Sequence, residues 1–158
     1  MTSDLDIQAL AFFTADHAAV AEGKLYVNGG CWDKLQFPRY PQAFPMAVVA
    51  VLLIPYRAYH QDHRFGIDLE DADGRELLHV EGQFRVGTDP AMRVGDPTVM
   101  PFAVPVNTMA VQKPGDHAFV FRVDGTEIAR YRLRAVQIAA PVIPGSGHPS
   151  TPGESASE

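Results

Sequence analysis

Hydrophobic side chains along most of the chain either alternate with polar ones or form short runs between turn residues. This pattern is typical of β-strands. Residues 46–54 are apolar throughout, which predicts a central strand covered on both faces. Residues 99–112 are apolar but carry Pro101 and Pro105, which favours an edge strand. The other predicted strands are residues 7–13, 24–28, 63–69, 75–86, 117–123 and 126–138.

The last two predicted strands form a hairpin around an Asp-Gly pair. A two-residue loop would place Phe119 opposite Arg130. A three-residue loop, residues 123–125, places Phe119 opposite Ala129 and keeps the apolar side chains of both strands on one face. A one-residue slip would bury the arginines, so we prefer the three-residue loop.

Helical periodicity is weak, and the one candidate is a short turn at residues 16–22, which Asp16 would cap and Gly23 would end. The remaining pattern predicts an all-β domain, a two-layer antiparallel β-sandwich of immunoglobulin-like type over residues 1–138. Residues 139–158 are rich in Pro, Gly and Ser, and we expect a flexible, disordered C-terminal tail there.

Composition and charge exclude several classes of protein. The formal net charge is −6 in 158 residues, which disfavours a nucleic-acid partner. The longest apolar run is less than half of a membrane span, so no membrane association is expected. Cys31 is the single cysteine, and this is typical of a reducing, cytoplasmic compartment. We expect Cys31 to be a small buried residue rather than a reactive one.

Several short motifs of turn and polar residues occur along the chain, at residues 16–18, 22–25, 27–30, 71–74, 114–117 and 124–125. Their order resembles that of a family of short bacterial proteins of uncharacterised function. The resemblance spans residues 7–138 and implies a β-rich fold, but no activity. A looser resemblance is to immunoglobulin-like domains, in which a Pro-Gly turn leads to a tyrosine that bonds back to the backbone. His117 holds that position here.

Arginine recurs at every second position of the last strand, at Arg130, Arg132 and Arg134, and Arg122 falls on the same face. Such a stripe can bind an acidic partner. A solvated outer face is the alternative. A second candidate surface is the proline-rich segment with Phe37, Tyr40 and Phe44. Its aromatic side chains could contact a partner, or they could pack over one end of the domain.

His60, Asp62 and His63 form the most metal-like stretch, although no fourth ligand is nearby. We expect a polar loop there, no metal site and no cofactor. No nucleophile motif or phosphate-binding loop occurs, so no catalytic residue is assigned.

We therefore expect a non-enzymatic, cytoplasmic interaction or accessory module whose partner is another protein. The alternative is a small-ligand or metal-binding protein that uses the His60, Asp62 and His63 loop. Homo-oligomerisation through edge strands is a further option.

Overall fold

The computed structural model describes residues 6–142, and the greater part of the expected tail, from residue 143, lies outside them. Among the described residues, no helix is long and apolar enough to cross a membrane. The short 3-10 helix η1 covers Tyr56–Ala58. The strands are β1 (Gln8–Ala21), β2 (Lys24–Gly30), β3 (Lys34–Phe37), β4 (Gln42–Ala43), β5 (Met46–Ile54), β6 (Asp62–Asp71), β7 (Glu76–Arg85), β8 (Thr98–Val106), β9 (Ala110–Val111), β10 (Gly115–Val123) and β11 (Thr126–Gln137).

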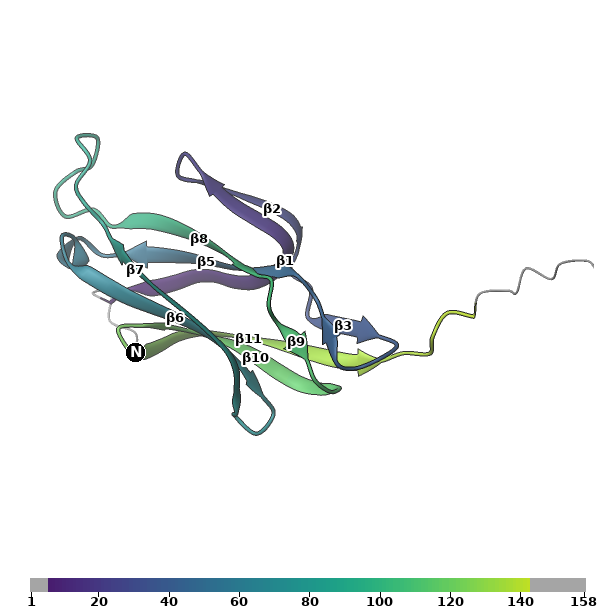
Figure 1. Cartoon of the computed structure of the whole chain (residues 1–158). Helices are drawn as coiled ribbons and strands as arrows, with labels where there is room; N and C mark the ends of the chain where they lie inside the picture. Colours follow the sequence, from purple (N-terminus) through teal and green to yellow (C-terminus); the bar gives the residue numbers. More distant parts are fainter. Residues whose placement is uncertain (1–5, 143–158) are drawn as a thin grey trace, which may run out of the picture.

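The strands form two larger sheets that lie over one another (Figure 1). One sheet has the order β2-β1-β5-β8, and the other has the order β3-β11-β10-β6-β7. Strands β4 and β9 form a separate small pair. The prediction of an all-β chain is confirmed. Pairing is antiparallel except between β3 and β11, which are parallel, so one part of the expected antiparallel topology is wrong.

The main core lies between the two sheets. Side chains of a strand point alternately to its two faces, so every second residue of each central strand enters this core. Residues 46–54 form β5, which lies between β1 and β8, as predicted for a central strand. The face towards the main core is buried along the strand, and the outer face is buried at Ala47 and Val49 but partly exposed at Val51 and Leu53. The core is built around Val48, Ala50, Leu52 and Ile54 of β5 and around Ile67, Leu69, Phe119, Phe121 and Leu133 of the other sheet.

Residues 16–21 continue strand β1, so the prediction of a helical turn at 16–22 is wrong. The first half of β1 pairs with β5, and its second half pairs with β2. Glu22 and Gly23 form the hairpin turn between β1 and β2, with positive φ values of 51° and 72°. Alanine-rich sequence favours a helix locally, but pairing with neighbouring strands overrides that preference.

The β1–β2 hairpin folds back over the outer face of its own sheet (Figure 1). Both strands come close to β8, although β5 separates β1 from β8 in the sheet order. Ala18 and Leu25 of the hairpin pack against Ala47 and Val49 of β5 in a second, smaller core. This cover explains why Val49 is fully buried on the face that points away from the main core.

The β10–β11 hairpin has a two-residue turn, so the preferred three-residue loop is wrong. Asp124 and Gly125 both have positive φ, 50° and 83°. A bulge at Ile128 then shifts the register, and Phe119 lies opposite Tyr131. The bulge restores the apolar alignment of the two strands, which a two-residue loop without a bulge would lose.

Strand β8 lies at the edge of its sheet, as Pro101 and Pro105 predict. Proline has no N–H to donate, so it is tolerated on a strand whose outer side has no neighbour. The predicted segment 99–112 is longer than this strand, because β9 follows as a separate element.

The absence of a side chain at Gly82 of β7 makes room for a core ring. A Cβ atom there would lie 2.6 Å from the ring of Phe65, which packs against Phe102 and Phe121. We predict that Gly82→Ala lowers the free energy of unfolding by about 1–3 kcal/mol, the usual cost of overpacking a core. Urea denaturation measures the change.

The matched control is Gly66→Ala on the neighbouring strand β6, where a Cβ atom would meet its nearest neighbour, His79, at 3.5 Å. This variant should be neutral or stabilising by up to about 1 kcal/mol. Equal losses in both variants would mean that adding a Cβ atom destabilises either strand, and that the clash with the Phe65 ring does not determine the result.

Candidate functional site

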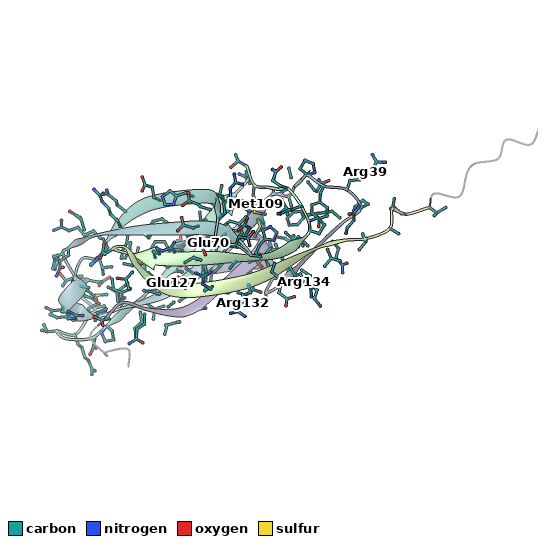
Figure 2. All side chains as sticks on the ribbon, turned by 90° about the horizontal axis from the view of Figure 1, so that it is seen from below. Arg39, Glu70, Met109, Glu127, Arg132 and Arg134 are labelled. Atoms are coloured by element: carbon teal, nitrogen blue, oxygen red, sulfur yellow. The ribbon has the colours of Figure 1, made fainter. Side chains whose placement is uncertain are left out.

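The arginines of β11 line the outer face of the five-stranded sheet (Figure 2). Tyr131 and Leu133 between them pack into the core, so strand alternation sends Arg130, Arg132 and Arg134 to the opposite side. The structure places all three on one face, as their spacing predicts.

Two of the four predicted arginines are held by carboxylates of neighbouring strands. Arg122 forms ion pairs with Asp68 and, at 3.2 Å, with Glu70. Arg130 lies 2.9 Å from Glu70 and 2.9 Å from Glu127. The hydrogen bond from Arg130 lowers the pKa of Glu127 below its ordinary value. These two guanidinium groups are therefore already engaged within the chain.

This charged network covers an apolar position on the outer face of β10. Val120 lies between Arg130 on one neighbouring strand and Asp68 on the other, and it is fully buried. The long arginine side chain can cover apolar surface with its methylene groups while its charge stays near water. The network thus has a structural role on this face.

Arg132 and Arg134 differ from the other two arginines. Arg134 lies 3.6 Å from Asp116, and both side chains are largely exposed. The Arg132 side chain has no hydrogen bond or ion pair with any residue within 6–142. A cleft of about 540 Å³ opens beside these arginines. It is lined by Asp33, Asp71, Ala72, Asp116, His117, Ala118, Arg130, Arg132, Leu133 and Arg134.

His117 forms one wall of this cleft and is buried. Its Nδ1 donates a hydrogen bond to the Gly115 carbonyl at 3.0 Å, since a carbonyl oxygen only accepts. The side chain thus bonds back to the backbone two residues upstream.

The aromatic residues of the proline-rich segment pack against each other and against the core. Phe37 lies 5.9 Å from Tyr40 and 5.7 Å from Phe44 between ring centroids, and all three are only partly exposed. Tyr40 donates a hydrogen bond from its hydroxyl to the Val136 carbonyl at 3.0 Å. The geometry favours the packing interpretation over an exposed partner site.

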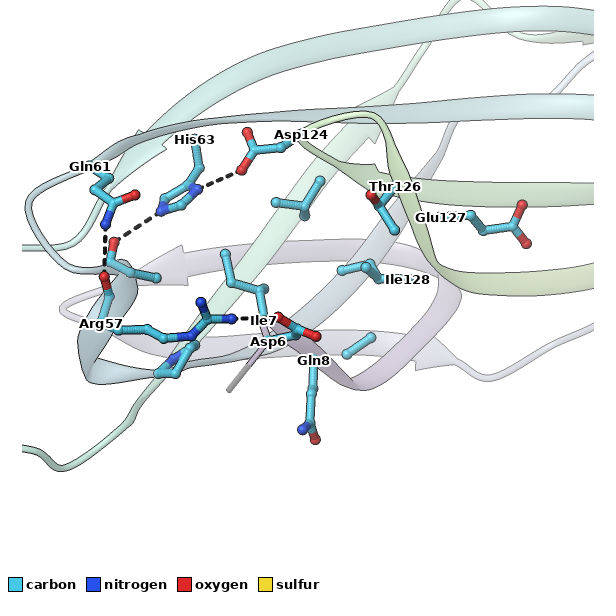
Figure 3. A pocket seen from close by; sticks show the side chains of 14 residues that line it. Asp6, Ile7, Gln8, Arg57, Gln61, His63, Asp124, Thr126, Glu127 and Ile128 are labelled. Carbon is cyan, nitrogen blue, oxygen red and sulfur yellow. Dashed lines mark hydrogen bonds and ion pairs between the residues drawn. The ribbon is translucent and has the colours of Figure 1, made fainter. Parts of the chain in front are cut away.

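A second cleft, of about 570 Å³, lies between the start of β1, η1 and the β10–β11 turn (Figure 3). His63 stands in its wall. Its Nδ1 lies 2.7 Å from a carboxylate oxygen of Asp124, and its Nε2 lies 2.9 Å from the Ala58 carbonyl. Both ring nitrogens face acceptors, which leaves no lone pair for a metal ion. Asp62, next to it in sequence, pairs with Arg85 at 3.4 Å.

Asp124 joins the β10–β11 turn to β6. Its second carboxylate oxygen accepts a hydrogen bond from the Arg64 backbone N–H at 2.9 Å. Burial opposes protonation of His63, but hydrogen bonds to Asp124 and Ala58 outweigh it, so the pKa of His63 is raised. Burial likewise disfavours the charged form of Asp124, but bonds to His63 and Arg64 prevail and lower the pKa of this carboxyl.

Asp68, Glu76 and His79 form the one group in residues 6–142 with three potential ligand atoms within 4.8 Å of one another. Asp68 accepts from His79 at 2.5 Å and is paired with Arg122. A guanidinium group therefore already supplies the positive charge that a metal ion would bring.

Cys31 is exposed, so the expectation of a buried residue is wrong. Its φ of 64° marks a tight turn in which the chain leaves β2 and crosses towards β3. Cys31 lines neither of the two clefts described above.

Sequence reasoning missed Asp124 and Asp68 as partners of charged side chains. In the sequence, Asp124 has the pattern of a turn residue. It lies 61 residues from His63, so no local pattern indicates that the two side chains meet. Asp68 occupies an outward position on a strand whose other face is apolar, and a carboxylate there is unremarkable until β10 brings Arg122 alongside it.

The comparisons with known proteins identify the family of the chain. The model of a family of unknown function, DUF6941, matches residues 10–136, and the chain belongs to this family. The predicted resemblance to a β-rich family without assigned activity is thereby confirmed. A search of curated proteins finds no significant match.

Among solved structures, the chain is similar to the C-terminal domain of wzt, with 13% identity, a TM-score of 0.43, and coverage of 84% of this chain and 74% of that one. It is also similar to the alkylpurine DNA glycosylase AlkC of Pseudomonas fluorescens, with 8% identity, a TM-score of 0.40, and coverage of 85% and 31%. A third is a β-glucosidase of Listeria innocua, with 10% identity, a TM-score of 0.41, and coverage of 85% and 17%. Likenesses at this level carry no functional argument.

The His63–Asp124 pair should make stability depend on pH. A pKa raised in the folded state contributes stability that is complete below the unfolded pKa of about 6.5 and is lost as the pH rises through the folded value. We predict that Asp124→Asn, which keeps the turn conformation, destabilises the protein by about 1 kcal/mol below pH 6.5 because a charge-assisted hydrogen bond is lost. The difference from wild type should shrink as the pH rises through the raised pKa of His63.

Urea denaturation of both proteins across this pH range measures the difference. His63→Gln is the second arm, and in its background Asp124→Asn should have no pH-dependent effect. A difference between wild type and Asp124→Asn that stays constant with pH would contradict protonation of His63 as its source.

Proposed function

We propose that the protein is a non-catalytic interaction module whose partner is another protein. The observation that carries this proposal is the position of Arg132: it is an exposed arginine beside a cleft, and its side chain forms no ion pair or hydrogen bond with a described residue. Arginine is enriched at the centres of protein interfaces, where its planar group forms several hydrogen bonds at once.

The charge pattern of the cleft supports a protein surface over a simple anion as the ligand. Three arginines and three aspartates line the cleft, so their formal charges balance. A phosphate or nucleic-acid backbone would meet the aspartates as well as the arginines. A surface of alternating charge can match both, and such complementarity contributes specificity.

An immunoglobulin-like β-sandwich is the finer description of the fold that we propose. The strand order β11-β10-β6-β7 corresponds to the G-F-C-C′ sheet of immunoglobulin domains, and β1-β5-β8 corresponds to A-B-E. The bond from His117 to the Gly115 carbonyl supports the same interpretation. This architecture carries many unrelated functions, so the binding surface must be argued from its own residues.

The chemistry of the possible nucleophiles and ligands supports a role without catalysis. Cys31 lies outside both clefts, and His63 uses both ring nitrogens in hydrogen bonds to its own chain. The single cysteine supports a cytoplasmic location.

Quantitative affinity capture from native lysate tests the proposal with Arg132→Glu as the disrupting variant. Arg93→Glu, an exposed arginine on the loop before β8, is the control with the same change in charge. We predict a partner captured by wild type and by Arg93→Glu but lost by Arg132→Glu. The purified partner should then bind wild type at least tenfold more tightly than it binds Arg132→Glu, since a charged interfacial contact contributes roughly 2 kcal/mol or more.

Equal capture by all three proteins would place any interface elsewhere on the molecule. Absence of a partner in every arm would contradict the interaction module itself. The fold of each variant is checked by circular dichroism and urea denaturation, so loss of structure is distinguished from loss of binding.

A further inference from the structure

The free edges of the two large sheets differ in how well they resist pairing with another strand. Natural edge strands are protected by proline, by bulges, by charged side chains or by shortness. β8 carries two prolines, β3 has only four residues, and β2 ends in two glycines. Where β1 and β11 lack an outer neighbour, each carries a bulge, at Leu10 and Ile128.

Within the described part of the chain, β7 relies on charged side chains and on one bulge near its start. It is ten residues long, forms the edge of the five-stranded sheet and contains no proline. Its single irregularity lies at Leu77, beside the β6–β7 turn, so residues 78–85 run regularly along the free edge. No described backbone group outside β6 is bonded to this stretch. A row of unpaired N–H and C=O groups of this length is a template for a further strand.

The side chains of β7 indicate that a second copy fits this edge. The side chains of opposite residues in an antiparallel pair lie on the same face of the sheet. In a two-fold dimer of β7 strands, each residue therefore lies opposite a residue that is an even number of positions away. One residue then lies on the axis, opposite its own copy. With Val80 on the axis, His79 of each copy, which already lies 3.5 Å from Glu81 of its own chain, also lies opposite Glu81 of the other copy. With Glu81 on the axis, two carboxylates would face each other. With Gly82 on the axis, His79 would face Arg85. With Gln83 on the axis, Glu81 would face Arg85, which lies 3.4 Å from Asp62 of its own chain.

We propose that the protein forms a two-fold dimer in which the β7 strands of two copies pair antiparallel with Val80 on the axis. The two five-stranded sheets then become one continuous sheet. Main-chain hydrogen bonds provide the pairing, and two His79–Glu81 contacts across the axis favour this register over those that place Glu81 opposite Glu81 or His79 opposite Arg85. This proposal goes beyond the proposed function and does not depend on the arginine cleft.

Sedimentation equilibrium of the full chain tests the dimer. Wild type should dimerise reversibly at micromolar concentration. Glu81→Lys should weaken dimerisation roughly tenfold or more, because both contacts across the axis change from attraction to repulsion. The Glu81 side chain is 80% exposed, so this change is compatible with the fold.

The control with the same change in charge is Glu22→Lys in the remote β1–β2 turn, and it should dimerise like wild type. A wild-type monomer at every concentration would overturn the proposal, as would equal dimerisation of Glu81→Lys and wild type.

Disulfide trapping tests the register. Opposite residues in an antiparallel pair have Cα atoms about 4.5–5.5 Å apart, which is within disulfide reach. In a Cys31→Ser background, Val80→Cys should form a covalent dimer under mild oxidation. Gln83→Cys, on the same strand but opposite Leu77 in this register, should not. Equal trapping of both, or of neither, would overturn this pairing.

The dimer and the proposed function fail in different experiments. Arg132→Glu should leave the dimer intact, and Glu81→Lys should keep the partner of the arginine cleft. Loss of dimerisation in Arg132→Glu would contradict an interface at β7 and would move it to the cleft.

Discussion

The central strands of both sheets carry apolar side chains on both faces, so each sheet must be covered on its outer side as well as its inner side. Val49 of β5 and Val120 of β10 point away from the main core, and neither has exposed surface. Leaving such side chains in water would forfeit roughly 1.5–3 kcal/mol each. The arrangement of the remaining chain follows from how the two outer faces are covered.

The two sheets meet this requirement with different chemistry. On the four-stranded sheet, the β1–β2 hairpin folds over and adds a small apolar core. On the five-stranded sheet, arginine and carboxylate side chains lie over Val120 and pair with one another. The paired arginine and carboxylate side chains leave a polar outer surface on the five-stranded sheet. A partner-binding role therefore falls more naturally on the five-stranded sheet, where two arginines remain beyond those that the cover uses.

Local patterns predict what depends on one or two neighbouring strands. The apolar run of residues 46–54 is β5 without change of bounds, and Pro101 with Pro105 predicts the edge position of β8. The pattern fails where the outcome depends on distant contacts. Residues 16–22 have a helical composition, but pairing partners on β2 hold most of them in a strand. Ile128 is an ordinary strand residue in sequence, yet its bulge sets the register of the hairpin.

The same difference between local patterns and distant contacts applies to the candidate site. Alternation alone predicts that Arg130, Arg132 and Arg134 share a face, because this requires only that β11 is a strand. It cannot predict which arginine remains available, because that depends on carboxylates supplied by β6 and by the bulged turn. Glu70 and Glu127 engage Arg130 and leave Arg132 without a described partner. The distinction between an arginine engaged within the chain and one that is proposed to bind a partner thus arises only at the level of the sheet.

The two proposed interfaces lie on different strands of one sheet. In the order β3-β11-β10-β6-β7, the strand that carries Arg132 and the strand proposed to pair with a second copy are separated by β10 and β6, although the cleft also reaches Asp71 and Ala72 in the turn before β7. Pairing through β7 would fix the two arginine clefts on one continuous sheet. Two linked sites of modest affinity bind a partner with repeated or paired surfaces far more tightly than either does alone, provided that the geometry allows both to engage. Dimerisation through β7 would thus turn a small charged cleft, which is weak by itself, into a bivalent binding surface.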